Sequence, residues 1–138
     1  MQRRSEYLMT RHDAREQAFM VLFEKIFDKE ATLGEIAAKA EESDLIKINA
    51  FAKSLLEKAE ANADAIDELI DGNTVGWSLD RLARVSLAVM RLAVTEIKFC
   101  DETPVGVAVN EAVLIAKKYG TPEDAAYING VLGTIAKA

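Results

Sequence analysis

Cationic side chains gather near the start of the chain, where they could bind phosphate. Arg11, His12 and Arg15 fall on the first turns of a predicted helix, with Arg3 and Arg4 upstream. Exposed cations there oppose the helix dipole by about 0.3–1 kcal/mol each, so helix stability does not explain them. A bound anion would reverse the sign of this effect, because helix N-termini and arginines both attract phosphate. Ion pairing with nearby glutamates would account for the arginines equally well.

Aromatic and basic residues are also neighbours near the end of the chain. Lys117 and Lys118 precede Tyr119, and Tyr127 follows eight positions later. Tyrosine rings stack on unpaired bases while lysines attract phosphate, which is the combination that single-stranded RNA requires. Packing of each tyrosine at the rim of the core is the alternative explanation.

The residues needed for catalysis or metal binding are scarce. The chain has one histidine, His12, and one cysteine, Cys100, so a nucleophilic couple would have to join a surface imidazole to a buried thiol. No cysteine cluster can form, and Gly72 and Gly76 lack the lysine of a phosphate-binding loop. We therefore expect no enzymatic activity, no metal and no cofactor.

A central helix over Leu79–Cys100, with Ser78 as its N-cap, is predicted from apolar residues that occupy almost every direction around it. Its polar residues follow one narrow line, with spacings of seven, four and three, formed by Arg84, Arg91, Thr95 and Lys98. This line is either a solvated seam or a docking face for a protein partner.

Helical periodicity and capping signals cover most of the remaining sequence, and no segment alternates at period two. Thr10 and Thr32 begin capping boxes, a break is expected near Asn62, and Gly120 should end a helix. The fold class is therefore all-α, a bundle of six or seven helices. The other expected helices are Arg11–Phe27, a short helix from Thr32 through Ala40, a longer one from Ile48 to Ile70, one after Pro104, and Pro122–Ala136.

The charge is unevenly distributed along the 138 residues. The formal charge is −6, but residues 26–71 alone hold five basic and twelve acidic side chains, while the two ends are close to neutral. A basic surface could therefore form from the ends while the middle stays acidic. We expect one helical domain over residues 11–138, a flexible extension over residues 1–10, no membrane association and a cytoplasmic location.

Several segments, in order along the chain, resemble the NusB family of bacterial transcription antitermination factors. The Asn-Glu-Ala and Ile-Asn-Gly-Val-Leu elements are the most specific, and residues 28–75 match in helical pattern only. The matching segments are Ala14–Ala18, Leu22–Phe23, Met90–Glu96, Thr103–Pro104, Val109–Val113, Ala116–Gly120 and Tyr127–Leu132.

This resemblance implies two helical subdomains and binding of the boxA element in ribosomal RNA leader transcripts, together with the ribosomal protein NusE and within an RNA polymerase antitermination complex. The family's RNA contacts map onto Arg11, His12, Arg15, Tyr119, Glu123 and Tyr127. Because His12 and Asp13 interrupt the usual run of arginines, we expect weaker RNA binding unless Arg3 and Arg4 compensate. A protein adaptor without RNA affinity is the alternative, and a weak homodimer is a further expectation. Asn110 and Asn129 are interpreted as buried structural amides.

Overall fold

The computed structural model describes residues 10–74 and 76–138. Within them lie seven α-helices and one 3₁₀ helix, and no strand. The predicted all-α fold is therefore confirmed. The helices are α2 (Arg11–Phe27), α3 (Leu33–Glu42), α4 (Ala50–Ala61), α5 (Ala63–Asn73), α6 (Arg84–Phe99), α7 (Val105–Tyr119) and α8 (Pro122–Lys137), with η1 (Leu79–Arg81) before α6. No helix in these ranges is long and apolar enough to cross a membrane.

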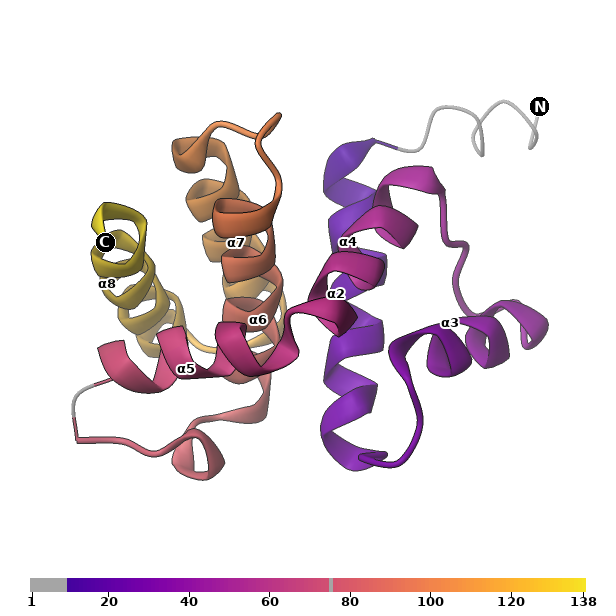
Figure 1. Cartoon of the computed structure of the whole chain (residues 1–138), viewed down its shortest axis with the longest axis horizontal. Coiled ribbons are helices and arrows are strands. Elements are labelled where there is room, and N and C mark those ends of the chain that lie inside the picture. Colours follow the sequence, from indigo (N-terminus) through magenta and orange to yellow (C-terminus); the bar gives the residue numbers. More distant parts are fainter. Residues whose placement is uncertain (1–9, 75) are drawn as a thin grey trace.

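Helix α6 is the centre of the bundle. It packs against α2, α4, α5, α7 and α8, and Figure 1 shows it between a group formed by α2, α3 and α4 and a group formed by α5, α7 and α8. Residues on all its sides are buried, among them Ala88, Val89 and Met90, which have no exposed surface. The prediction of a core helix is confirmed, and its neighbours determine where the charged residues of the other helices meet.

Threonine caps fix the beginnings of three helices. In each, the threonine hydroxyl accepts a hydrogen bond from the backbone three residues later, and the acidic side chain there accepts one from the threonine N–H. The pairs are Thr10 with Asp13, Thr32 with Glu35 and Thr121 with Asp124. Asn62 separates α4 from α5 as expected, because its side-chain amide donates to the Lys58 carbonyl at 2.9 Å and competes with helical bonding.

The predicted start of the central helix is wrong. Only η1 forms at Leu79–Arg81, Leu82 and Ala83 are extended with ψ of 148° and 138°, and α6 begins at Arg84. The hydroxyl of Ser78 donates to the Asp80 carboxylate at 2.6 Å and makes no capping bond. The residues before α6 therefore form a loop.

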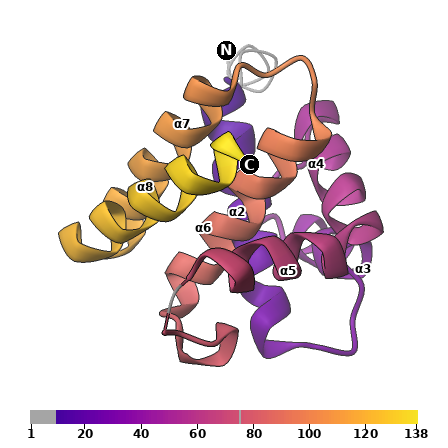
Figure 2. The same ribbon diagram turned by 60° about the vertical axis from the view of Figure 1, so that its left-hand side comes forward.

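A tight turn places α7 and α8 side by side (Figures 1 and 2). Gly120 ends α7, as predicted, and its N–H donates to the Ala116 carbonyl at 2.8 Å. A Cβ added to Gly120 would lie 2.9 Å from Asp124 Oδ2 and 3.0 Å from the Ala116 carbonyl. Glycine is needed here because two helices approach closely.

Candidate nucleic-acid interface

The first turns of α2 lie against α7. Two segments that are about a hundred residues apart in the sequence therefore contact each other. His12 Nδ1 is 2.7 Å from Glu111 Oε1 of α7, and its Nε2 is 3.4 Å from Glu16 Oε2 on the next turn of α2. Arg11 is exposed, with its guanidinium 4.4 Å from the centre of the Phe51 ring. This distance is that of a cation–π contact.

Arg15, in contrast, belongs to the core. It is 5% exposed and donates from Nε to both carboxylate oxygens of Glu96 at 2.8 and 3.0 Å. Its Nη1 also donates to Glu111 at 3.3 Å. Burial lowers the pKa of Arg15, but the hydrogen bonds and charges of the two glutamates outweigh burial and raise the pKa above its usual value. The structure thus places Arg15 in the core with its guanidinium bonded to two glutamates, and an RNA contact by Arg15 stays a prediction.

The end of α7 brings a lysine and a tyrosine to the same place. Lys118 Nζ donates to both oxygens of the Glu16 carboxylate at 3.0 Å and lies 5.3 Å from the centre of the Tyr119 ring. The hydrogen bond with Glu16 is the main cause that raises the pKa of Lys118. Tyr119 is half-buried, with its ring centre 5.0 Å from that of Phe19. His12, Lys118 and Tyr119, which we call the junction group, are therefore together around Glu16.

Two other predicted RNA contacts, Glu123 and Tyr127, lie apart from the junction group. They line a pocket of about 250 Å³ together with Trp77 and Arg81. The Tyr127 hydroxyl is buried without a hydrogen-bond partner among the described residues, and burial raises the pKa of Tyr127. Trp77, which is 52% exposed, was not among the predicted site residues. Its position four residues before Arg81 was the only hint in the sequence that an aromatic and a basic side chain lie close together here. Arg4, a further predicted contact, is outside the described residues.

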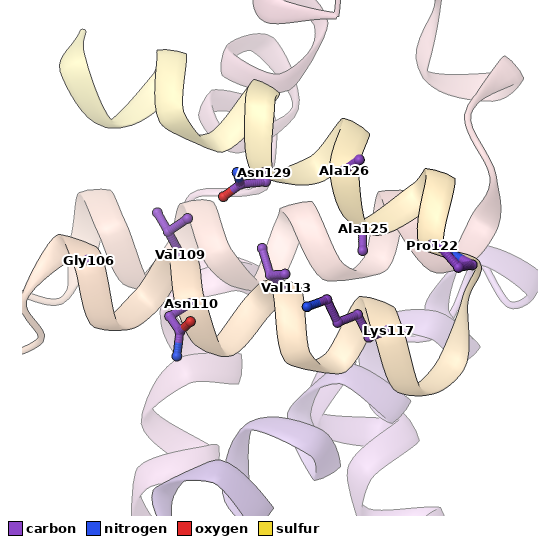
Figure 3. Close-up of a pocket in the computed structure, with 9 residues that line it drawn as sticks. All are labelled: Gly106, Val109, Asn110, Val113, Lys117, Pro122, Ala125, Ala126 and Asn129. Atoms are coloured by element: carbon purple, nitrogen blue, oxygen red, sulfur yellow. The ribbon is translucent and has the colours of Figure 1, made fainter.

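A groove of about 730 Å³ runs between α7 and α8 (Figure 3). Lys117, the remaining predicted RNA contact, is exposed and lines this groove with Pro122 and Val113. Asn110 and Asn129 are exposed along it, and Figure 3 shows Asn110 pointing away from α8. Their interpretation as buried structural amides is wrong, because both residues lie on exposed sides of α7 and α8.

The polar line along α6 is no continuous docking face. Thr95 has no exposed surface, and its hydroxyl donates to the Arg91 carbonyl at 2.7 Å. Arg91 binds both oxygens of Asp67 in α5, at 2.9 and 3.0 Å. The other two residues also contact the protein itself: the Arg84 guanidinium is 5.2 Å from the Phe27 ring centre, and Lys98 donates to the Ala138 carbonyl. The docking prediction is corrected for Thr95, which no partner could reach.

Over the described residues, these features define a class of protein: an all-helical protein with charged and aromatic side chains where α2 and α7 meet. Among the described residues, no group of histidine, cysteine and acidic side chains could hold a metal. The model of the NusB family matches residues 12–137, and the chain belongs to this family.

Relatives and solved structures agree with this assignment. The transcription antitermination protein NusB of Natranaerobius thermophilus is 36% identical and aligns over 93% of this chain and 95% of its own length. The structure of T. maritima NusB superposes with a TM-score of 0.81 and 32% identity, covering 93% of this chain and 91% of that one.

A structure of the antitermination factors NusB and NusE in complex with double-stranded RNA superposes with a TM-score of 0.80 and 32% identity, covering 92% and 96%. The relative named above is a transcription antitermination protein, which agrees with the expectation that this chain has no enzymatic activity.

Proposed function

We propose that this protein binds the boxA element of ribosomal RNA leader transcripts, as a single strand and together with NusE. In an RNA polymerase antitermination complex in the cytoplasm, it thereby promotes read-through of terminators. The observation that carries this proposal is the junction group, which combines cations and an aromatic face at the meeting of α2 and α7. The solved complex of a relative with NusE and RNA supports both partners.

The chemistry of the junction group suits a nucleotide. Lys118 has a side chain that is 58% exposed, and His12 is 36% exposed, so both can reach a phosphate. Arg11 adds a further cation at the same end of α2, where the helix N-terminus itself favours anions. The half-buried Tyr119 ring can support one base, and such stacking contributes about 1–3 kcal/mol per base.

The same place also contains carboxylates, which limit the attraction of RNA. Glu16 and Glu111 contact His12, and the chain as a whole carries a formal charge of −6. Few phosphate contacts and an acidic body predict weak binding by the isolated protein with a shallow dependence on salt. NusE should tighten binding, because the two proteins and the RNA would share one coupled equilibrium.

These carboxylates also favour a second candidate, an adaptor that binds protein partners only. Arg15 is already satisfied by Glu96, and Lys118 by Glu16, so two of the predicted RNA-binding cations have partners without RNA. The adaptor would still bind NusE.

A weak homodimer is an independent proposal, which sedimentation at several protein concentrations tests.

Fluorescence anisotropy with labelled boxA-like single-stranded RNA, with and without NusE and at two salt concentrations, separates the two candidates. Lys118→Met should weaken binding to all RNA sequences alike and reduce the salt slope by about one. Lys39→Met is the matched control, because Lys39 is exposed on α3 and the replacement makes the same charge change. If wild-type protein binds no RNA even with NusE present, while still binding NusE, the adaptor is correct.

A further inference from the structure

Glu16 is the residue around which the junction group is arranged. Its carboxylate accepts two hydrogen bonds from Lys118, lies 3.5 Å from the Tyr119 hydroxyl, and lies 3.4 Å from His12 Nε2. Lys118 and Tyr119 are 102 and 103 positions away in sequence. One side chain thus contacts all members of the junction group, from both helices.

A carboxylate is an unexpected neighbour for a phosphate-binding site. Its charge repels RNA, and at 7% exposure it has also lost most of its contact with water, which is costly for a charged group. The pair with Lys118 repays little of this cost, because an ion pair with a largely exposed partner is screened by solvent. Stability alone therefore gives a weak reason for Glu16 at this position.

We propose that Glu16 is a positioning residue for RNA binding, one that holds the Lys118 ammonium next to the Tyr119 ring and beside His12. This inference rests on the proposed function. A free lysine side chain loses much rotational entropy when it is ordered on a ligand. Lys118 is ordered before RNA arrives, so a phosphate and the base stacked on Tyr119 would meet groups that are already in place.

Glu16→Gln tests this proposal because positioning and electrostatics predict opposite signs. The variant keeps the size of the side chain and one oxygen that can accept from Lys118, and it removes the negative charge. If Glu16 only repels RNA, the variant binds more tightly than wild type. If Glu16 positions Lys118, affinity for boxA-like RNA with NusE present should fall about tenfold, which corresponds to about 1.4 kcal/mol.

Glu24→Gln is the matched control, because Glu24 is an exposed carboxylate two turns further along α2. It should bind RNA as wild type does or slightly more tightly. In a Lys118→Met background, Glu16→Gln should have no further effect beyond about twofold, because the residue through which it acts is gone. A full additional loss in that background would indicate a general structural role.

A second measurement does not need RNA. Because the hydrogen bond that Lys118 donates to Glu16 raises the pKa of Lys118, less of its amine is unprotonated and able to react. Acetylation with an N-hydroxysuccinimide ester, quantified by peptide mass spectrometry with Lys117 as internal reference, should become severalfold faster at Lys118 in Glu16→Gln. An unchanged ratio, or RNA binding by the variant equal to or tighter than wild type, overturns the positioning role alone. Absence of RNA binding by wild type overturns the proposed function, and the inference with it.

Discussion

Replacement of Arg15 by methionine should destabilise the fold by about 3–5 kcal/mol, the usual result when one partner of a buried ion pair is removed. Glu96 is 1% exposed, and Arg15 donates to it from both Nε and Nη2, the latter at 2.5 Å. Methionine fills similar space but offers no donor, so the Glu96 carboxylate would remain buried without this partner. The whole free energy of unfolding of a domain is about 5–15 kcal/mol, so this loss is a large fraction.

Urea denaturation followed by circular dichroism measures the effect. Slopes for small proteins are about 1–3 kcal/mol per molar urea, so the midpoint should fall by about 2 M. Arg11→Met is the control, since Arg11 is exposed and its contact with Phe51 contributes about 0.5–1 kcal/mol. The double replacement Arg15→Met with Glu96→Leu should recover much of the stability, because the buried Glu96 carboxylate is then removed as well, while Glu111 keeps its contact with His12.

The same variants also assign the role of Arg15 in RNA binding. Arg15→Met with Glu96→Leu should bind RNA as wild type does, because Arg15 is 5% exposed and already donates to Glu96 and Glu111. Wild-type stability in Arg15→Met together with weakened RNA binding would refute the reasoning, since Arg15 would then serve the ligand and not the core.

Three other changes test separate parts of the structure. Arg91→Ala and Asp67→Ala should each lower the free energy of unfolding by about 1 kcal/mol in thermal melts. The double variant should lose less than the sum of the two single losses, and a loss equal to that sum would exclude coupling between the two residues. Gly120→Ala should lower it by about 1–3 kcal/mol, because its Cβ would meet Asp124 and the Ala116 carbonyl; an unchanged melting temperature would contradict that contact. Hydrogen bonds from Thr32 lower the pKa of Glu35, so Glu35 stabilises the protein above its unfolded pKa and loses this effect as pH falls through the lowered pKa. Glu35→Gln should therefore be less stable than wild type near neutral pH and equal to it in acid; a difference that persists in acid would disprove this assignment.

Local signals were sufficient to predict much of the fold. The capping boxes at Thr10 and Thr32 placed two helix starts correctly, and the break at Asn62 followed from the loss of periodicity there. Ser78 had the same type of signal, yet its hydroxyl bonds to Asp80. A serine hydroxyl can bond either to a helix N-terminus or to a nearby side chain, and the sequence does not show which of the two bonds forms.

The candidate site depends on long-range contacts, which spacing cannot supply. The sequence indicated that Arg15 needs an anion, but its partner Glu96 is 81 positions away. Spacing along α6 placed Thr95 on the same line as Arg91, but burial depends on the helices that surround that line. The sequence could therefore indicate which residues have suitable chemistry, but it could not predict which of them are exposed.

The long separation between α2 and its charged partners has a consequence for synthesis on the ribosome. Arg15 is made 81 residues before Glu96 and 96 residues before Glu111. At about 5–20 residues per second, Arg15 is synthesised about 5–20 s before Glu111. The Arg15–Glu96 pair can form only after α6 has been translated, and the junction group only after α7. A chain truncated before α7 would therefore lack the candidate interface even though it contains Arg11 and His12.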